Sequence, residues 1–281
     1  MKRKKIILCE GDSWTAGDIV DPEIFGDDVS KVNDVANRPY RLPKVWPGKL
    51  EKIKEGVKVL NTSVSGSSND GIVRRVIGNV LYLLNERNYD PKDIFVMVGW
   101  SSPERKDFYY KGDYSATETI YPHELEKRYG APELDSFHKL YVTYFWNEEE
   151  YIMRFIRQVL FLDGFLKSRG INYKFFNAFY EIEGSFLMDE DANFNFLDNL
   201  KNKVSQMNLN SIDDNSLFSL ETILGEMERI YSSNFIDISF QQFILSNIKE
   251  TGESDKYFYD HHPSELSHGL WAEFLKDKIE I

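Results

Sequence analysis

Groups suited to nucleophilic catalysis occur near both ends of the sequence. Gly11-Asp12-Ser13 directly follows an apolar run, and the segment "YDHHPSELSH" near the C-terminus holds three of the chain's five histidines. A serine hydroxyl becomes a nucleophile when an imidazole accepts its proton and a carboxylate fixes the imidazole tautomer. The two segments together therefore supply the groups needed for acyl transfer through a serine.

The elements that must position these groups follow from the apolar pattern. Strand-like runs cover residues 4–9, 57–63, 93–100 and 172–178, with a weaker run at 234–239. Between and after them, apolar residues recur at helical spacing, as in residues 69–87, 148–170 and 263–279. This alternation predicts a mostly parallel five-stranded sheet with helices on both faces. Ligands collect at the carboxyl ends of such strands, where Ser13 is expected.

The ends of the next two predicted strands carry further polar groups. The second strand leads into Gly66-Ser67-Ser68-Asn69, and the third ends in Gly99-Trp100-Ser101. A tetrahedral oxyanion needs fixed hydrogen-bond donors, such as backbone N–H groups and a polar side chain. Ser13 and Gly66 are candidates for the backbone donors, and Ser101 or Asn69 for the side-chain donor.

Three segments of the chain resemble the SGNH/GDSL hydrolase family. "GDSWTAG" resembles its first block, "NTSVSGSSND" the block that supplies a glycine N–H to the oxyanion hole, and "DHHPSELSHGLWAEFL" its last block. They occur in the family's order and span nearly the whole chain. The resemblance implies a flavodoxin-like three-layer α/β/α sandwich. It also implies an esterase, deacetylase or related acyl hydrolase without a metal or cofactor.

The resemblance also assigns roles to individual residues. Ser13 corresponds to the nucleophile, His262 to the general base and Asp260 to the carboxylate that orients it, while the N–H groups of Ser13 and Gly66 correspond to oxyanion donors. Asp260 precedes His262 by two residues, where the family usually has three. The alternative base is His268, in the helical segment that follows.

The third block departs from the family pattern. The family commonly has Gly-x-Asn-Asp after the third strand, and this chain has "GWSSPER", so Ser101 stands where the oxyanion asparagine is expected. Losing one such donor typically lowers turnover by about 10²–10³-fold. A catalytically weak or inactive module that binds a glycan or a protein therefore remains an alternative to an ester hydrolase.

Each candidate also has an ordinary structural interpretation. Ser13 could cap a helix, His262 could be a solvated loop residue, and Gly66 could simply permit a turn. Trp14, Trp100 and Arg105 are candidates for substrate contacts, and Arg105 could equally form an ion pair. The neighbouring segments supply no second ligand cluster for a metal, so we expect none.

Composition narrows the class of protein further. The net charge of −12 argues against a nucleic-acid partner, which normally meets a basic surface. Cys9 is the single cysteine and is expected to be an inert core thiol. The short apolar run after "MKRKK" ends at Glu10, so we expect neither a signal peptide nor a membrane span, and a soluble cytoplasmic protein.

The chain is expected to form one domain over residues 1–281, with two insertions. Residues 103–147 are rich in aromatic residues, which could stack on sugars, form a small separate core or mediate oligomer contacts. Residues 183–219 are rich in Asn and Asp and read as surface helices and turns. The expected substrate is a small-molecule or carbohydrate ester, with an O-acetylated sugar as one candidate.

Overall fold

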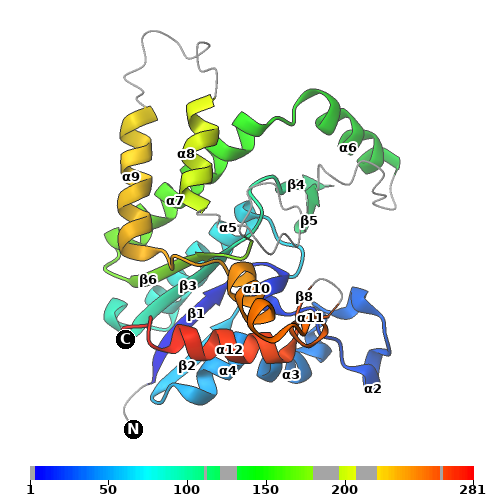
Figure 1. Ribbon diagram of the computed structural model, residues 1–281, viewed down its shortest axis with the longest axis vertical. Coiled ribbons are helices and arrows are strands. Elements are labelled where there is room, and N and C mark those ends of the chain that lie inside the picture. Colours follow the sequence, from blue (N-terminus) through cyan, green and yellow to red (C-terminus); the bar gives the residue numbers. More distant parts are fainter. Residues whose placement is uncertain (1–3, 111–112, 121–131, 180–195, 207–219, 260–261) are drawn as a thin grey trace.

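The computed structural model describes residues 4–110, 113–120, 132–179, 196–206, 220–259 and 262–281 (Figure 1). Within them the centre is a parallel four-stranded sheet in the order β2-β1-β3-β6. Its strands are β1 (Lys5–Glu10), β2 (Val57–Asn61), β3 (Ile94–Trp100) and β6 (Asn172–Asn177). Ile7 pairs with Val59 on one side and Phe95 on the other. Because all four strands run in the same direction, their carboxyl ends lie at one edge.

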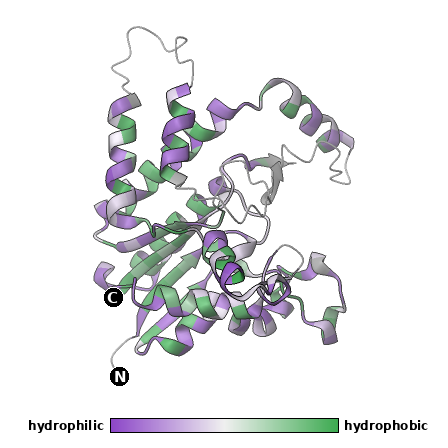
Figure 2. Cartoon of the chain, viewed as in Figure 1, coloured by the Kyte–Doolittle hydropathy of each residue, from purple (hydrophilic) through white to green (hydrophobic). Residues whose placement is uncertain are grey.

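Alternating side chains of the strands divide the core into two layers. Ile6 and Leu8 point into one cluster, and Ile7 and Cys9 into the other. The first cluster is covered by α5 (Asn69–Leu81), α7 (Glu148–Ser168), α8 (Phe196–Gln206) and α9 (Leu220–Asn234). The second is covered by α4 (Trp46–Ile53), α10 (Phe240–Thr251) and α12 (Glu265–Lys276). Figure 2 shows apolar residues concentrated in the strands and on the inner helix faces. The expected α/β/α sandwich is confirmed.

Shorter elements complete the described chain. The short α-helices are α1 (Ser13–Ala16), α2 (Pro22–Phe25), α3 (Arg38–Arg41) and α11 (Ser254–Tyr257). The 3-10 turns are η1 (Val29–Lys31), η2 (Val35–Asn37), η3 (Leu42–Lys44) and η5 (Pro91–Asp93), and η4 (Tyr82–Glu86) is a π-helical turn after α5. β7 (Phe258–Tyr259) and β8 (His262–Pro263) pair antiparallel before α12. No helix in the described part combines the length and the apolarity needed to cross a bilayer.

The predicted fifth strand is the main departure from the expected sheet. In the part of the chain that the structure describes, residues 234–239 contribute one isolated parallel bridge, between Phe175 and Phe235. The helix α9 extends to Asn234, and Ser239 already caps α10 through a capping box with Gln242. Only a few residues remain between the two helices, which is too short a length for a regular ladder.

The described part of the aromatic-rich segment contains a small cluster of aromatic rings. The hairpin of β4 (Lys106–Tyr110) and β5 (Asp113–Ile120) lies beside α6 (Pro132–Tyr144), at the periphery in Figure 1. Phe108 packs edge-on against Phe137 and Tyr141, at ring-centroid distances of 4.8 and 5.1 Å. Of the Asn/Asp-rich insertion, residues 196–206 form α8, which packs against α7 and α9, and most of the remainder lies outside the described residues.

Trp271 is central to the layer that carries the C-terminal helix. Its ring stacks on Phe240 at 4.8 Å and contacts Phe176 at 5.3 Å, and the side chain has no solvent exposure. We expect Trp271→Ala to lower the free energy of unfolding by about 3–5 kcal/mol, since it leaves a large cavity. Urea denaturation measures this change. The control Phe161→Ala removes a ring that is 59% exposed and should change stability by less than about 0.5 kcal/mol. Equal losses of unfolding free energy in the two variants would contradict the central packing role of Trp271.

Candidate active site

Ser13 lies at the carboxyl end of β1, in a turn that requires glycine. A Cβ on Gly11 would lie 2.4 Å from Oγ1 of Thr15 and 2.9 Å from the carbonyl oxygen of Gly99. Asp12 then caps α1, because its carboxylate accepts a 3.0 Å hydrogen bond from the N–H of Trp14. Ser13 is the first residue of α1, and only 5% of it is exposed. The turn therefore fixes one buried serine at the sheet edge where ligands are expected.

His262 meets Ser13 from the opposite end of the chain. Its Nε2 lies 3.1 Å from Oγ of Ser13, although 249 positions separate the two residues. His262 pairs with Tyr259 in the β7–β8 hairpin, and the N–H of Ser264 donates to the carbonyl of Tyr257 at 2.9 Å. Ser264 also caps α12, so the hairpin is anchored to the helix that follows it. This short hairpin holds the imidazole over the serine.

A carboxylate that the sequence analysis did not single out also contacts the imidazole. Oδ2 of Asp18 lies 3.0 Å from Nε2 of His262. Asp18 follows Gly17, whose φ of +81° favours glycine. A Cβ at Gly17 would also lie 2.1 Å from Cγ1 of Val45. The predicted orienting residue Asp260 and its neighbour His261 lie outside the described residues.

The loop after β2, which contains Gly66, is hydrogen-bonded to the serine turn. The N–H of Val64 donates to the carbonyl of Gly11 at 3.4 Å, and the N–H of Ser67 closes a tight turn onto Val64 at 3.2 Å. Gly66 has a φ of +78°, a backbone conformation that side-chain-bearing residues rarely adopt. The structure thus explains why this turn needs glycine at position 66.

The two candidate side-chain donors are bonded to other groups. Asn69 accepts from the N–H of Ser101 at 2.9 Å and donates to its carbonyl at 3.0 Å. The hydroxyl of Ser101 donates to Asp12 at 2.7 Å and accepts from Arg105 at 2.9 Å. In this arrangement Asn69 ties α5 to the end of β3, and the proton of the Ser101 hydroxyl is directed at Asp12.

The remaining candidates for substrate contacts are engaged inside the protein. Arg105 forms an ion pair with the buried Asp12 at 3.3 Å, and its guanidinium lies 5.6 Å from the ring centre of Phe179. Trp14 and Trp100 are each 1% exposed and belong to the two core clusters. Both indole rings therefore pack in the core, and their contact with a substrate stays a prediction.

Two ionisable residues at the end of β1 are also structural. Burial raises the pKa of the Cys9 thiol well above its usual value, which agrees with an inert core cysteine. Burial likewise raises the pKa of Glu10, although Arg75 and Thr62 bind its carboxylate and oppose the shift. Among the described residues, no three His, Cys, Asp or Glu side chains group together as metal ligands.

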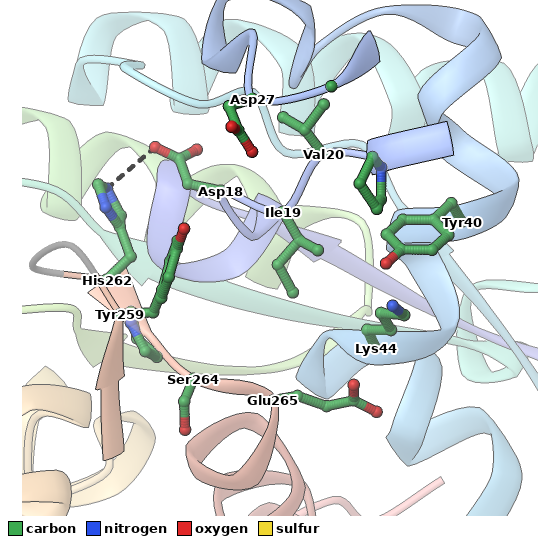
Figure 3. A pocket seen from close by; sticks show the side chains of 13 residues that line it. Asp18, Ile19, Val20, Asp27, Tyr40, Lys44, Tyr259, His262, Ser264 and Glu265 are labelled. Atoms are coloured by element: carbon green, nitrogen blue, oxygen red, sulfur yellow. Dashed lines mark ion pairs between the residues drawn. The ribbon is translucent and has the colours of Figure 1, made fainter. Parts of the chain in front are cut away.

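A cavity of about 420 Å³ opens on the side of His262 that Asp18 occupies (Figure 3). Its apolar walls come from Ile19, Val20, Pro22, Tyr40, Tyr259 and Pro263, and its charged groups are Asp18, Asp27, Glu265 and Lys44. The ammonium of Lys44 lies 3.5 Å from the ring centre of Tyr40. The mixture of apolar faces and a few polar groups is typical of a small-molecule site.

Comparisons with known proteins give a family and a group of similar structures. The family model described as "Family of unknown function (DUF6071)" matches residues 27–279, and no curated protein matches the chain significantly. One similar structure is a member of the lipolytic protein G-D-S-L family from Veillonella parvula, with 13% identity and a TM-score of 0.43 over 97% of this chain and 96% of that chain. Another is a catalytic mutant of Axe2, an acetylxylan esterase from Geobacillus stearothermophilus, with 16% identity and a TM-score of 0.38 over 98% and 94%. A third is phospholipase A1 from Streptomyces albidoflavus, with 12% identity and a TM-score of 0.33 over 98% and 100%.

The alternative base, His268, is buried in the second core layer. It has no solvent exposure, its ring lies 5.6 Å from that of Phe240, and neither ring nitrogen has a hydrogen-bond partner within the described residues. Burial, together with the smaller effects of the charges of Lys49 and His262, lowers its pKa to about 3. A neutral, buried imidazole of this kind is poorly suited to accept a proton from serine.

The lowered pKa of His268 makes stability depend on pH. Below about pH 6.5 the unfolded chain binds a proton that the folded protein excludes, so stability falls as the pH falls toward 3. This residue should contribute about 2 kcal/mol to the loss of stability between about pH 7.5 and about pH 5. Urea denaturation at both pH values should show a smaller loss for His268→Leu than for the wild-type protein. An identical loss of stability in the variant and the wild-type protein would contradict the lowered pKa of His268.

Proposed function

The chain belongs to the family of unknown function DUF6071, and we propose that it hydrolyses carboxylic esters through a serine nucleophile. The observation that carries this proposal is the 3.1 Å contact between Nε2 of His262 and Oγ of Ser13 at the carboxyl edge of the parallel sheet. An imidazole within hydrogen-bonding distance of a serine is the arrangement that activates the hydroxyl. The resemblance of both segments to the SGNH/GDSL family supports the same assignment.

The proposed reaction proceeds in two steps. The Ser13 oxygen bonds to the ester carbonyl carbon while Nε2 of His262 takes the hydroxyl proton. The bond to the alcohol oxygen then breaks, and Nε2 returns the proton to that oxygen, which leaves the acyl group on Ser13. A water molecule then bonds to the acyl carbon while the same nitrogen takes one of its protons. The bond between the acyl carbon and Oγ of Ser13 breaks, and Nε2 returns the proton to Oγ, which releases the acid and regenerates the serine. Asp260 is proposed to orient the imidazole through the other ring nitrogen.

The oxyanion of the tetrahedral intermediate is proposed to bind the backbone N–H groups of Ser13 and Gly66. The positive φ of Gly66 and the hydrogen bond from Val64 to the serine turn support this pairing of loops. Ser101 and Asn69 are proposed to act indirectly, by fixing Asp12 and the end of β3. An oxyanion hole formed by backbone N–H groups is consistent with the sequence, which has Ser101 where the SGNH/GDSL family commonly has an asparagine.

The proposed substrate is a small-molecule or carbohydrate ester, including O-acetylated sugars. The cavity volume of about 420 Å³ falls within the range of small-ligand sites. The rings of Tyr40 and Tyr259 offer apolar faces of the kind that pack against a sugar ring. The strongly negative net charge disfavours a nucleic-acid partner.

A binding module with little or no activity is the second candidate. The observation that favours it is the hydroxyl of Ser101, which donates to Asp12 at 2.7 Å. Because the Ser101 hydroxyl donates its proton to Asp12, Ser101 does not replace the asparagine that is the third oxyanion donor in the SGNH/GDSL family. This candidate predicts that a fluorophosphonate probe leaves Ser13 unmodified while affinity for a glycan or a protein partner persists.

Replacement of Ser13 tests the proposed nucleophile. We expect Ser13→Ala to reduce hydrolysis of p-nitrophenyl acetate to the uncatalysed rate, since no oxygen remains to attack the carbonyl carbon. Mass spectrometry of fluorophosphonate-treated wild-type protein should show the added mass on the Ser13 peptide. Circular dichroism should show an unchanged fold. Wild-type hydrolysis rates in the variant would rule out Ser13 as the nucleophile.

Replacement of Ser101 tests the proposed oxyanion hole. We expect Ser101→Ala to lower kcat/KM by less than about tenfold, against about 10²–10³-fold for the loss of a direct oxyanion donor. The reason is that Arg105 pairs with Asp12 directly at 3.3 Å and continues to hold that carboxylate. His262→Ala, measured with the same ester, provides the reference for loss of the base. A decrease in kcat/KM of about 10²–10³-fold for Ser101→Ala would instead indicate that the Ser101 hydroxyl donates directly to the oxyanion.

A further inference from the structure

One ring nitrogen of His262 faces two oxygens. Its Nε2 lies 3.1 Å from Oγ of Ser13 and 3.0 Å from Oδ2 of Asp18. A ring nitrogen carries either one proton or one lone pair in the ring plane. With a proton, Nε2 donates to Asp18 and cannot take the serine proton. With a lone pair, it accepts from Ser13 but faces a carboxylate oxygen with no hydrogen between them. Asp18 and Ser13 therefore compete for the same ring nitrogen of His262.

The Asp18 carboxylate is held in this position by the loop after β2. The hydroxyl of Ser65 donates to Oδ1 of Asp18 at 2.5 Å. The N–H of Ser65 donates in turn to the side-chain oxygen of Asn33 at 3.1 Å. Oδ1 is thus satisfied within the protein, and Oδ2 is the oxygen directed at the imidazole. The Asp18 side chain is 25% exposed, so its carboxylate is accessible to a ligand.

The position of Asp18 corresponds to the leaving-group side of the site. In the proposed reaction Nε2 returns its proton to the alcohol oxygen, so that oxygen must lie against Nε2. Asp18 contacts the same nitrogen, and both residues line the cavity in Figure 3. The cavity therefore receives the alcohol part of the ester, with Oδ2 of Asp18 close to the scissile bond.

We propose that Asp18 determines specificity for the alcohol: its carboxylate binds a hydroxyl neighbouring the scissile ester, so the site prefers esters of polyhydroxylated alcohols. A hydroxyl donor satisfies Oδ2 and removes the competition for Nε2. An alkyl alcohol of the same size buries the carboxylate without a donor, which is costly for a charged group. The inference rests on the proposed function and adds the group that recognises the substrate.

The rest of the cavity fits the same class of alcohol. Asp27 and Glu265 add two more hydrogen-bond acceptors, while Lys44 is the single Lys or Arg side chain in the described lining. Oε1 of Glu265 is already paired with the ammonium of Lys49 at 3.0 Å. The carboxylates of Asp18 and Asp27 against the ammonium of Lys44 disfavour an anionic alcohol and favour a neutral one with several hydroxyls. The faces of Tyr40 and Tyr259 can pack against the carbon skeleton of such a molecule.

A matched pair of acetate esters tests the role of Asp18. Hydroxyethyl acetate and propyl acetate differ by a hydroxyl in place of a methyl group at the end of the alcohol. We expect the wild-type protein to have a kcat/KM at least about tenfold higher for hydroxyethyl acetate, and Asp18→Ala to reduce this ratio to about one. The ratio within each protein is independent of the fraction of protein that is active.

The control variant is Asp28→Ala, which removes a carboxylate that is not among the described lining residues of the cavity and that accepts hydrogen bonds from the N–H and the hydroxyl of Ser30. It should keep the wild-type ratio. A ratio that is unchanged in Asp18→Ala, or a wild-type ratio near one, would overturn the role of Asp18 and leave ester hydrolysis intact. Absence of hydrolysis of both esters by wild-type protein, together with an unlabelled Ser13, would overturn the proposed function and this inference with it.

Discussion

The geometry of the site depends on one buried carboxylate, that of Asp12. It has no solvent exposure, and it accepts hydrogen bonds from the N–H of Trp14, the hydroxyl of Ser101 and the guanidinium of Arg105. These three donors belong to the turn after β1, the end of β3 and the start of the aromatic insertion. Because a buried carboxylate is stable only when its oxygens are satisfied, Asp12 forces these segments together. Ser13, the next residue, is positioned as a result.

Much of this arrangement could be predicted from the sequence, because it depends on local patterns. The four strands, their helices and the position of Ser13 at a strand end follow from apolar periodicity and turn residues. The prediction of a fifth strand at residues 234–239 was wrong, because the sequence pattern does not reveal that α9 extends to Asn234 and that Ser239 already caps α10. The partners of Ser101 and Asn69 were also inaccessible, because a polar side chain chooses its partner only after the strands are paired.

The two histidines of the last segment show how burial separates similar sequence positions. His262 and His268 are six residues apart, and both lie near predicted strand ends or helix starts. His262 belongs to a two-residue strand at the edge of the cavity, where its ring reaches Ser13. His268 lies on the inward face of α12, where its ring packs on Phe240 without a hydrogen-bond partner in the described residues. Sequence spacing carries no information on this difference, which arises from the orientation of one helix against the sheet.

Burial also separates the roles of two carboxylates, those of Asp12 and Asp18. Both flank Ser13 in a single short segment, and the turn at Gly17 separates their environments. Asp12 is fully buried and saturated by protein donors, so it cannot bind a ligand and its contribution is structural. Asp18 is partly exposed, lines the cavity, and has one oxygen bound by Ser65 and the other against His262. A carboxylate in that position is accessible to the hydroxyl of a ligand in the cavity. Exposure and the number of satisfied oxygens, rather than residue type, therefore decide which acid supports the fold and which one lines the cavity.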